Sequence, residues 1–88
     1  MTMYSPHPEI SWRLIEDEIV ILRLRSLSYY SLEPVGAFLW QKIAERAMTR
    51  DELLGALIAE FEVDESTAGP DLDALLAELK REELIVAA

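Results

Sequence analysis

The residues that could perform acid–base, nucleophilic or metal chemistry are few and poorly placed for it. The chain has one histidine, His7, which lies between two prolines near the N-terminus, whereas a general base must be held rigidly beside its partner. There is no cysteine, which excludes cysteine nucleophiles and thiolate zinc sites. The acid pairs Asp71/Asp73 and Glu82/Glu83 lie one or two residues apart, and such neighbours do not converge on one point of a helix. We therefore predict no enzyme activity, no metal site and no cofactor.

Length and charge narrow the class of protein and of partner. At 88 residues the chain forms one domain at most. Its formal net charge is −9, and residues 60–88, with nine acidic and two basic side chains, carry −7 of it. Because nucleic-acid binding relies on Lys and Arg that neutralise phosphates, a nucleic-acid partner is disfavoured. The acidic C-terminal third either attracts a basic partner or forms a solvated face.

The sequence lacks the segments that are typical of membrane and secreted proteins. None of its apolar runs approaches the ~20 residues that a membrane-spanning helix needs. The N-terminus has no basic segment followed by an apolar one. We expect a cytoplasmic protein without a membrane partner.

Three segments in the first half of the chain alternate between apolar and polar residues, which is typical of half-buried strands. They are Ile10–Leu14, Val20–Arg25 and Tyr29–Leu32. Their short spacing predicts a three-stranded antiparallel β-meander. Residues 1–8 precede it as an extended arm, because two prolines spaced by one residue restrict the backbone there.

The register of this meander follows from which side chains share a face. Placing the apolar residues of the first two strands together requires Leu14 opposite Val20, with residues 16–18 as the loop. The same argument places Leu24 opposite Tyr30. The outer face of the meander would then carry Arg13, Ile15, Ile19, Ile21, Arg23 and Arg25.

Beyond the strands, the apolar period changes to that of a helix, and three helices are expected. Pro34 suits the first turn of a helix that runs to about residue 47. Thr49 and Glu52 have the spacing of a capping box, which predicts a second helix over residues 50–61. We expect a loop over residues 62–69, a third helix from Pro70 onward and a C-terminal apolar segment that packs back on the core. The fold class is therefore α+β: one domain of an arm (1–8), a meander (9–32) and three helices (33–86).

The last strand of the meander, residues 29–32, is an uncharged sheet edge without proline. Proteins usually protect such edges because their unpaired backbone groups bind other strands. Either the third helix or the tail covers this edge, or a partner strand pairs with it by β-augmentation. On the third helix, the residues predicted to face the core are Leu72, Leu76 and Leu79. One flank carries Asp71, Leu75, Glu78 and Glu82, and the other carries Asp73, Leu76, Lys80 and Leu84.

Several stretches together make the sequence resemble the PqqD-like family, the recognition elements for ribosomally synthesised and post-translationally modified peptides (RiPPs). The stretches that carry the resemblance are His7–Arg13, Glu18–Leu22, Tyr29–Trp40, Thr49–Leu53, Phe61–Asp64 and Leu76–Leu84. They span nearly the whole chain in the family's order. The chain departs from the family in having Glu33 where Asn is usual before the first helix. It also has Glu83 where Gly often precedes the apolar tail.

The resemblance implies a stand-alone, winged helix-turn-helix-like domain that binds the leader region of a precursor peptide. The leader is expected to add as a strand antiparallel to residues 29–32, beside the third helix, and to be delivered to a separate processing enzyme. A leader-cleaving cysteine protease of a lasso peptide pathway is favoured, and a radical enzyme of a PQQ or thioether pathway is the alternative. The expected leader-binding residues are Tyr29, Tyr30, Ser31, Leu32, Asp71, Leu72, Leu75, Leu76, Glu78, Leu79 and Glu82. Among them, Tyr29 and Leu75 are expected to form the main apolar pocket.

Two other classes remain as alternatives. A winged-helix DNA-binding domain has a similar order of elements but needs a basic recognition helix, and Arg50 is the only base in residues 50–61. The other alternative is a purely structural subunit.

Overall fold

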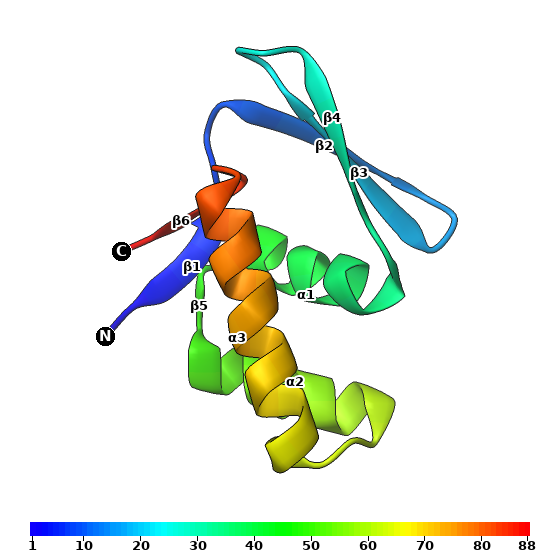
Figure 1. The fold of residues 1–88 in the computed structure, drawn as a ribbon, viewed down its shortest axis with the longest axis vertical. Coiled ribbons are helices and arrows are strands. Elements are labelled where there is room, and N and C mark those ends of the chain that lie inside the picture. The colour runs from blue at the N-terminus through cyan, green and yellow to red at the C-terminus, as the bar shows by residue number, and fades with distance from the viewer.

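The computed structural model describes residues 1–88 as three helices and six short strands in two antiparallel sheets. The strands are β1 (Met3–Pro6), β2 (Ile10–Ile15), β3 (Glu18–Arg23), β4 (Ser28–Leu32), β5 (Met48–Thr49) and β6 (Ile85–Ala87). The helices are α1 (Pro34–Glu45), α2 (Arg50–Phe61) and α3 (Glu65–Arg81). The meander β2-β3-β4 stands above the three helices, and both termini lie together at one side (Figure 1). This confirms the α+β class and the meander followed by three helices.

The β2–β3 turn is tighter than we predicted. Leu14 pairs with Ile19 rather than with Val20, and only Glu16 and Asp17 connect the two strands. Glu16 takes the left-handed conformation with φ of 59°. The one-residue difference in register reverses the faces: Ile19 and Ile21 are fully buried. They are therefore not on the outer face, as the sequence suggested.

The β3–β4 pairing also differs from the expectation, since Tyr30 lies opposite Ile21 and not opposite Leu24. The connection is a longer loop, in which Leu27 has φ of 57°. The side chains of Tyr30 and Leu32 nevertheless face the core. Leu32 is buried and Tyr30 is half-buried, whereas Tyr29 is 71% exposed on the outer face.

Helix α1 packs its buried side, including Trp40 and Ile43, into the core. A Cβ at Gly36 would lie 3.4 Å from the Leu32 side chain, so the first turn of α1 approaches β4 closely. The helix ends at Glu45, before the predicted end near residue 47, because Met48 and Thr49 form β5 and pair with β1.

The capping box predicted for α2 is present: the Thr49 side chain accepts a hydrogen bond from the Glu52 backbone N–H, and the Glu52 side chain accepts one from the Thr49 N–H. Helix α3 begins at Glu65, five residues earlier than predicted, so residues 65–69 are not a loop. Asp64 caps it by accepting from the Thr67 N–H at 2.9 Å. Pro70 lies inside this helix.

The N-terminal arm is extended but is not a free lead-in segment. As β1 it pairs with β5 on one side and β6 on the other. The C-terminal segment packs back on the core as predicted, since Leu84 and Ile85 are buried. The core contains 17 buried apolar residues and no buried charged residue. None of the helices combines the length and the apolar character needed to cross a membrane.

Candidate peptide-binding groove

One edge of the meander is open and faces α3. In the sheet order β2-β3-β4, the strand β4 has a partner on one side only. A cavity of about 410 Å³ lies along its other side, and we call it the edge groove. Its lining residues are Tyr30, Ser31, Leu32, Glu33, Val35 and Gly36 on the β4–α1 side, and Asp71, Leu75 and Glu78 on α3.

Helix α3 presents its acidic flank to this groove. Leu72, Leu76 and Leu79 are buried in the core and do not line the groove, although all three were expected to contact a leader. Leu75 is half-buried between Asp71 and Glu78 on the groove side. The groove therefore lies on the flank that carries Asp71, Leu75 and Glu78.

A cluster of polar side chains closes one end of the groove. Burial raises the pKa of Tyr30 to about 12, and a hydrogen bond to Glu78 together with the charges of Glu78 and Glu82 adds to this effect. The Arg23 guanidinium lies 5.8 Å from the centre of the Tyr30 ring. It donates to Glu82 Oε1 at 2.6 Å and to Ser28 Oγ at 3.4 Å. Glu82 is therefore ion-paired with Arg23 and does not add a free carboxylate to the flank that carries Asp71 and Glu78.

Tyr29 lies elsewhere. It pairs with Leu22 and lines a shallow cavity on the outer face of the meander, so the expected pocket between Tyr29 and Leu75 does not form. In its place the groove uses Val35 and Gly36 from the first turn of α1. Neither residue was among the expected leader-binding residues. The available signal was their position directly after the edge strand.

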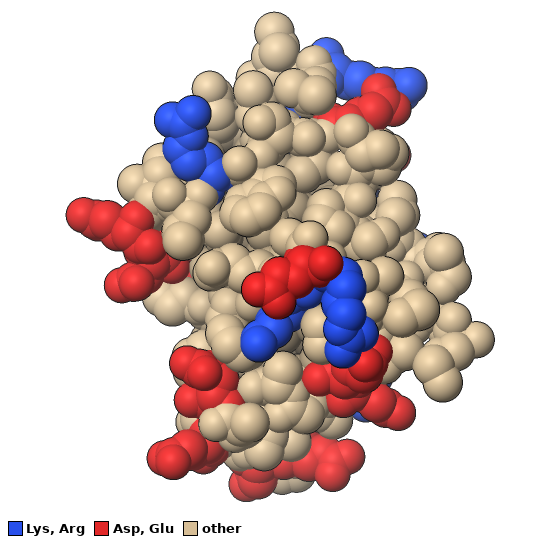
Figure 2. All heavy atoms as spheres, turned by 180° about the vertical axis from the view of Figure 1, so that it is seen from behind, with Lys and Arg blue, Asp and Glu red and all other residues tan.

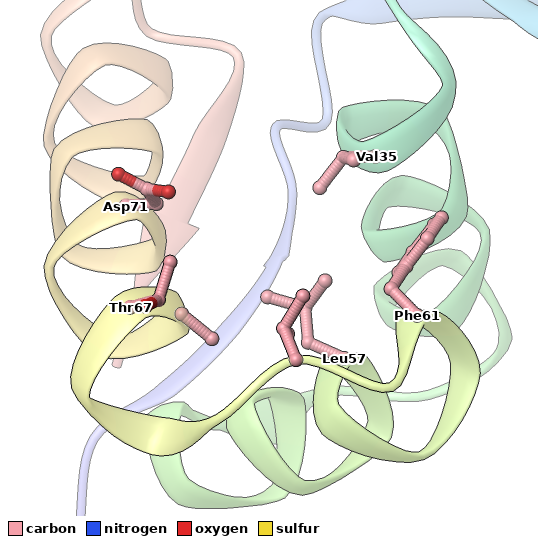
Figure 3. Close-up of a pocket in the computed structure, with 7 residues that line it drawn as sticks. Val35, Leu57, Phe61, Thr67 and Asp71 are labelled. Atoms are coloured by element: carbon pink, nitrogen blue, oxygen red, sulfur yellow. The ribbon is translucent and has the colours of Figure 1, made fainter.

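The edge groove continues into a second, more apolar cavity of about 320 Å³, which we call the deep pocket. Its lining residues are Val35, Leu57, Phe61, Val63, Thr67, Ala68 and Asp71. Figure 3 shows Val35 on α1 and Phe61 on α2 across from Thr67 and Asp71 on α3. Because Val35 and Asp71 line both cavities, the deep pocket opens at the Leu32 end of the groove.

The charge distribution does not suit nucleic acid. Seen from behind, acidic side chains gather over the lower part of the molecule (Figure 2). The C-terminal third of the chain, residues 60–88, contributes nine acids in all. The single base of α2, Arg50, is held by Asp73 of α3, with its Nε and one terminal nitrogen at 2.7 and 3.1 Å from the two carboxylate oxygens. A recognition helix needs cationic side chains available for phosphates.

The structure brings no catalytic constellation together. The Nδ1 of His7 accepts a hydrogen bond from the Glu9 backbone N–H at 3.0 Å. No group of three or more His, Asp or Glu side chains is placed to hold a metal ion. The chemistry that the groove offers is therefore backbone hydrogen bonding at an open strand edge, apolar contact at Leu75 and Val35, and carboxylates at Asp71 and Glu78.

The fold and the groove define a small α+β domain with an open strand edge beside a helix, and comparison with known proteins identifies its family. A family model described as "Coenzyme PQQ synthesis protein D (PqqD)" matches residues 18–85. The chain therefore belongs to the PqqD family.

Two solved structures resemble the chain over almost its full length. One is described as "TbiB1 in Complex with the TbiA(beta) Leader Peptide". It has a TM-score of 0.85 and 31% identity, covering 92% of this chain and 93% of that chain. The other, "Lasso peptide synthetase B1 complexed with the leader peptide", has a TM-score of 0.82 and 26% identity, with 94% and 96% covered. None of the curated proteins matches the chain.

Proposed function

We propose that this domain is a RiPP recognition element that binds the leader region of a precursor peptide and delivers it to a separate processing enzyme. The observation that carries the proposal is the open edge of β4 beside α3, in a fold shared with two domains that were solved with leader peptides. The leader adds as a strand antiparallel to β4 and satisfies its unpaired backbone groups.

The side chains of the leader then meet surfaces of different character. Those on the inner face of the extended sheet contact α3 and the first turn of α1, where Leu75 and Val35 take an apolar residue. An antiparallel leader enters at the Leu32 end, so the deep pocket receives an apolar side chain N-terminal to the strand. Burial of such anchors supplies most of the affinity in interfaces of this kind.

Delivery requires a second surface for the enzyme, and the outer face of the meander fits this role. Ile15, Val20, Leu22 and Tyr29 lie on it, around a shallow cavity of about 280 Å³. This face adjoins the leader site, because both include β4. The edge of β4 borders the leader site, and its residue Tyr29 lies on the outer face. A leader strand on β4 widens the same face, so an enzyme docked there contacts the domain and its cargo together.

The processing enzyme that we favour is the leader-cleaving cysteine protease of a lasso peptide pathway, which would place the domain in the cytoplasm. The likeness to a lasso peptide synthetase B1 supports this choice. A radical enzyme of a PQQ or thioether pathway is the alternative, and the family description is consistent with it.

Backbone methylation of the peptide tests strand addition without altering the protein. The probe is the leader of a short precursor identified among the neighbouring open reading frames, synthesised with single N-methylated residues along its binding segment. A strand bonded along one edge offers every second amide to β4. We therefore expect affinity to fall about tenfold or more at alternate positions and to change little between them, as measured by fluorescence anisotropy.

A uniform loss, or no loss at any position, would contradict strand addition. Absence of binding by the unmodified leader would contradict the proposed function itself.

A further inference from the structure

Strand β4 and the groove flank of α3 run side by side in opposite directions. We call each residue of β4 together with the residue of α3 opposite it a level of the groove. Arg23, which pairs with Ser28 at the start of β4, binds Glu82 near the end of α3, so the later residues of β4 lie level with earlier residues of α3. Tyr30 lies beside Glu78, whose charge acts on it, and Leu32 and Leu75 line the groove further along. Two residues advance a strand by about 6.6 Å, and three or four residues advance a helix by about 4.5–6 Å. Successive inner-face positions of a bound strand therefore meet successive turns of α3.

These levels differ in chemistry. The first, at Leu32 and Leu75, is apolar. At the far end Glu82 is already neutralised by Arg23 at 2.6 Å. The middle level is different, because Glu78 lies close to Tyr30 and takes part in none of the five ion pairs of the molecule. The bound strand thus passes one half-buried carboxylate that has no cationic partner.

The geometry points to Glu78 as a specificity-determining residue: it selects leaders that carry Lys or Arg at the residue paired with Tyr30. This inference rests on the proposed strand addition. Paired residues of antiparallel strands place their side chains on the same face, and the leader runs from the Leu32 end towards Ser28. The cation therefore lies two residues C-terminal to the apolar residue that pairs with Leu32.

The surroundings of Glu78 favour a cation over the alternatives. The Tyr30 hydroxyl is protonated at neutral pH, as an ordinary tyrosine is, and the Glu78 carboxylate has acceptor capacity for both this hydroxyl and a cation of the leader. A strand over the groove removes water from this carboxylate, which makes an unpaired charge costly and a charge-assisted hydrogen bond stronger. An acidic leader residue would meet like charge.

A library of displayed random peptides tests the inference and does not require the natural leader. The probe is an mRNA-displayed library of random 16-residue peptides, selected on the immobilised full chain and read by sequencing. The variants are Glu78→Lys and Glu78→Gln. The matched control is Glu60→Lys, which makes the same change of net charge on α2, at an exposed residue outside the edge groove.

On the wild type we expect enrichment of Lys and Arg two residues after a recurrent apolar position, and the same on Glu60→Lys. Glu78→Lys should enrich Asp and Glu at that position, and Glu78→Gln should show no charge preference there. Synthetic peptides that differ only by Lys or Glu at this position should bind the wild type with affinities about tenfold apart, as expected for one charge-assisted hydrogen bond. The order should reverse on Glu78→Lys.

Two outcomes would overturn the inference, and they are distinguishable. If apolar positions are enriched but the charge preference is absent, or persists in Glu78→Lys, then Glu78 does not read the leader and peptide binding still stands. If no peptide is enriched on the wild type, the proposed function fails and the inference fails with it. Circular dichroism of each variant establishes that the selections compare folded proteins.

Discussion

At the scale of single residues, the adjacent leucines Leu75 and Leu76 of α3 lie in different environments. Leu76 is buried in the core, whereas Leu75 is half-buried and lines the edge groove. The difference arises from the 100° rotation between neighbours on a helix, which turns one side chain to the core and the next to the flank. Leucines that look alike in the sequence therefore divide between the core and the groove.

Truncating each leucine should separate the two roles. Leu76→Ala should destabilise the domain by about 2–5 kcal/mol, because it leaves a cavity in the core. Leu75→Ala should change the melting temperature much less and weaken leader binding by about 1–3 kcal/mol. Thermal melts and titrations with the leader peptide measure both effects. A Leu75→Ala protein that is unstable but binds normally would show that this side chain serves the core.

Tyr30 should make the stability of the domain sensitive to high pH. Its pKa is raised to about 12 in the folded state, whereas an unfolded tyrosine titrates near ~10. The unfolded chain therefore loses this proton first, so the stabilisation is complete below pH ~10 and is lost as the pH rises towards ~12. Urea titrations across this range should show the decline. Tyr30→Phe, which lacks the hydroxyl, should show less of it, and an equal decline in both would place its origin elsewhere.

At the scale of elements, sequence reasoning succeeded where local signals were unambiguous. The Thr49–Glu52 capping box fixed the start of α2, and the period-3.6 pattern of α3 placed Leu72, Leu76 and Leu79 in the core. These features follow from patterns among residues that are close in the sequence, so they could be predicted from the sequence alone.

The strand registers could not be predicted, because β3 is aliphatic on both faces. Residues 19–22 read Ile-Val-Ile-Leu, so either parity buries apolar side chains and the alternation does not choose. The observed register requires Glu16 to adopt the left-handed conformation. Glutamate seldom does so, and its presence in the sequence therefore gave no signal for a two-residue turn. The start of α3 was also predicted wrongly, because two residues could each mark the first turn of a helix. Pro70 suggested a first turn, while the capping oxygen of Asp64 allowed the helix to begin earlier.

At the scale of the whole molecule, the meander separates two working surfaces. Its inner face packs on α1, its β4 edge borders the groove, and its outer face points away from the helices (Figure 1). The second sheet, β5-β1-β6, brings the two termini together, because the N-terminal strand β1 pairs with the C-terminal strand β6. The open edge of β4 and the apolar outer face are therefore accessible on different sides of the meander.

The outer face should be required for delivery and not for leader binding. Ile15 is 50% exposed there, at the end of β2 and outside the edge groove. Ile15→Glu should leave leader affinity and melting temperature nearly unchanged. It should also lower by about tenfold or more the rate at which the processing enzyme of the same pathway acts on the bound precursor, because a charge is placed in an apolar interface. The matched control is Leu24→Glu, a loop residue of similar exposure (49%) that does not line the outer cavity. Equal processing by both variants would remove the outer face from delivery. A concentration-dependent increase in mass of the wild type alone, measured by light scattering, would instead assign this face to a second copy of the chain.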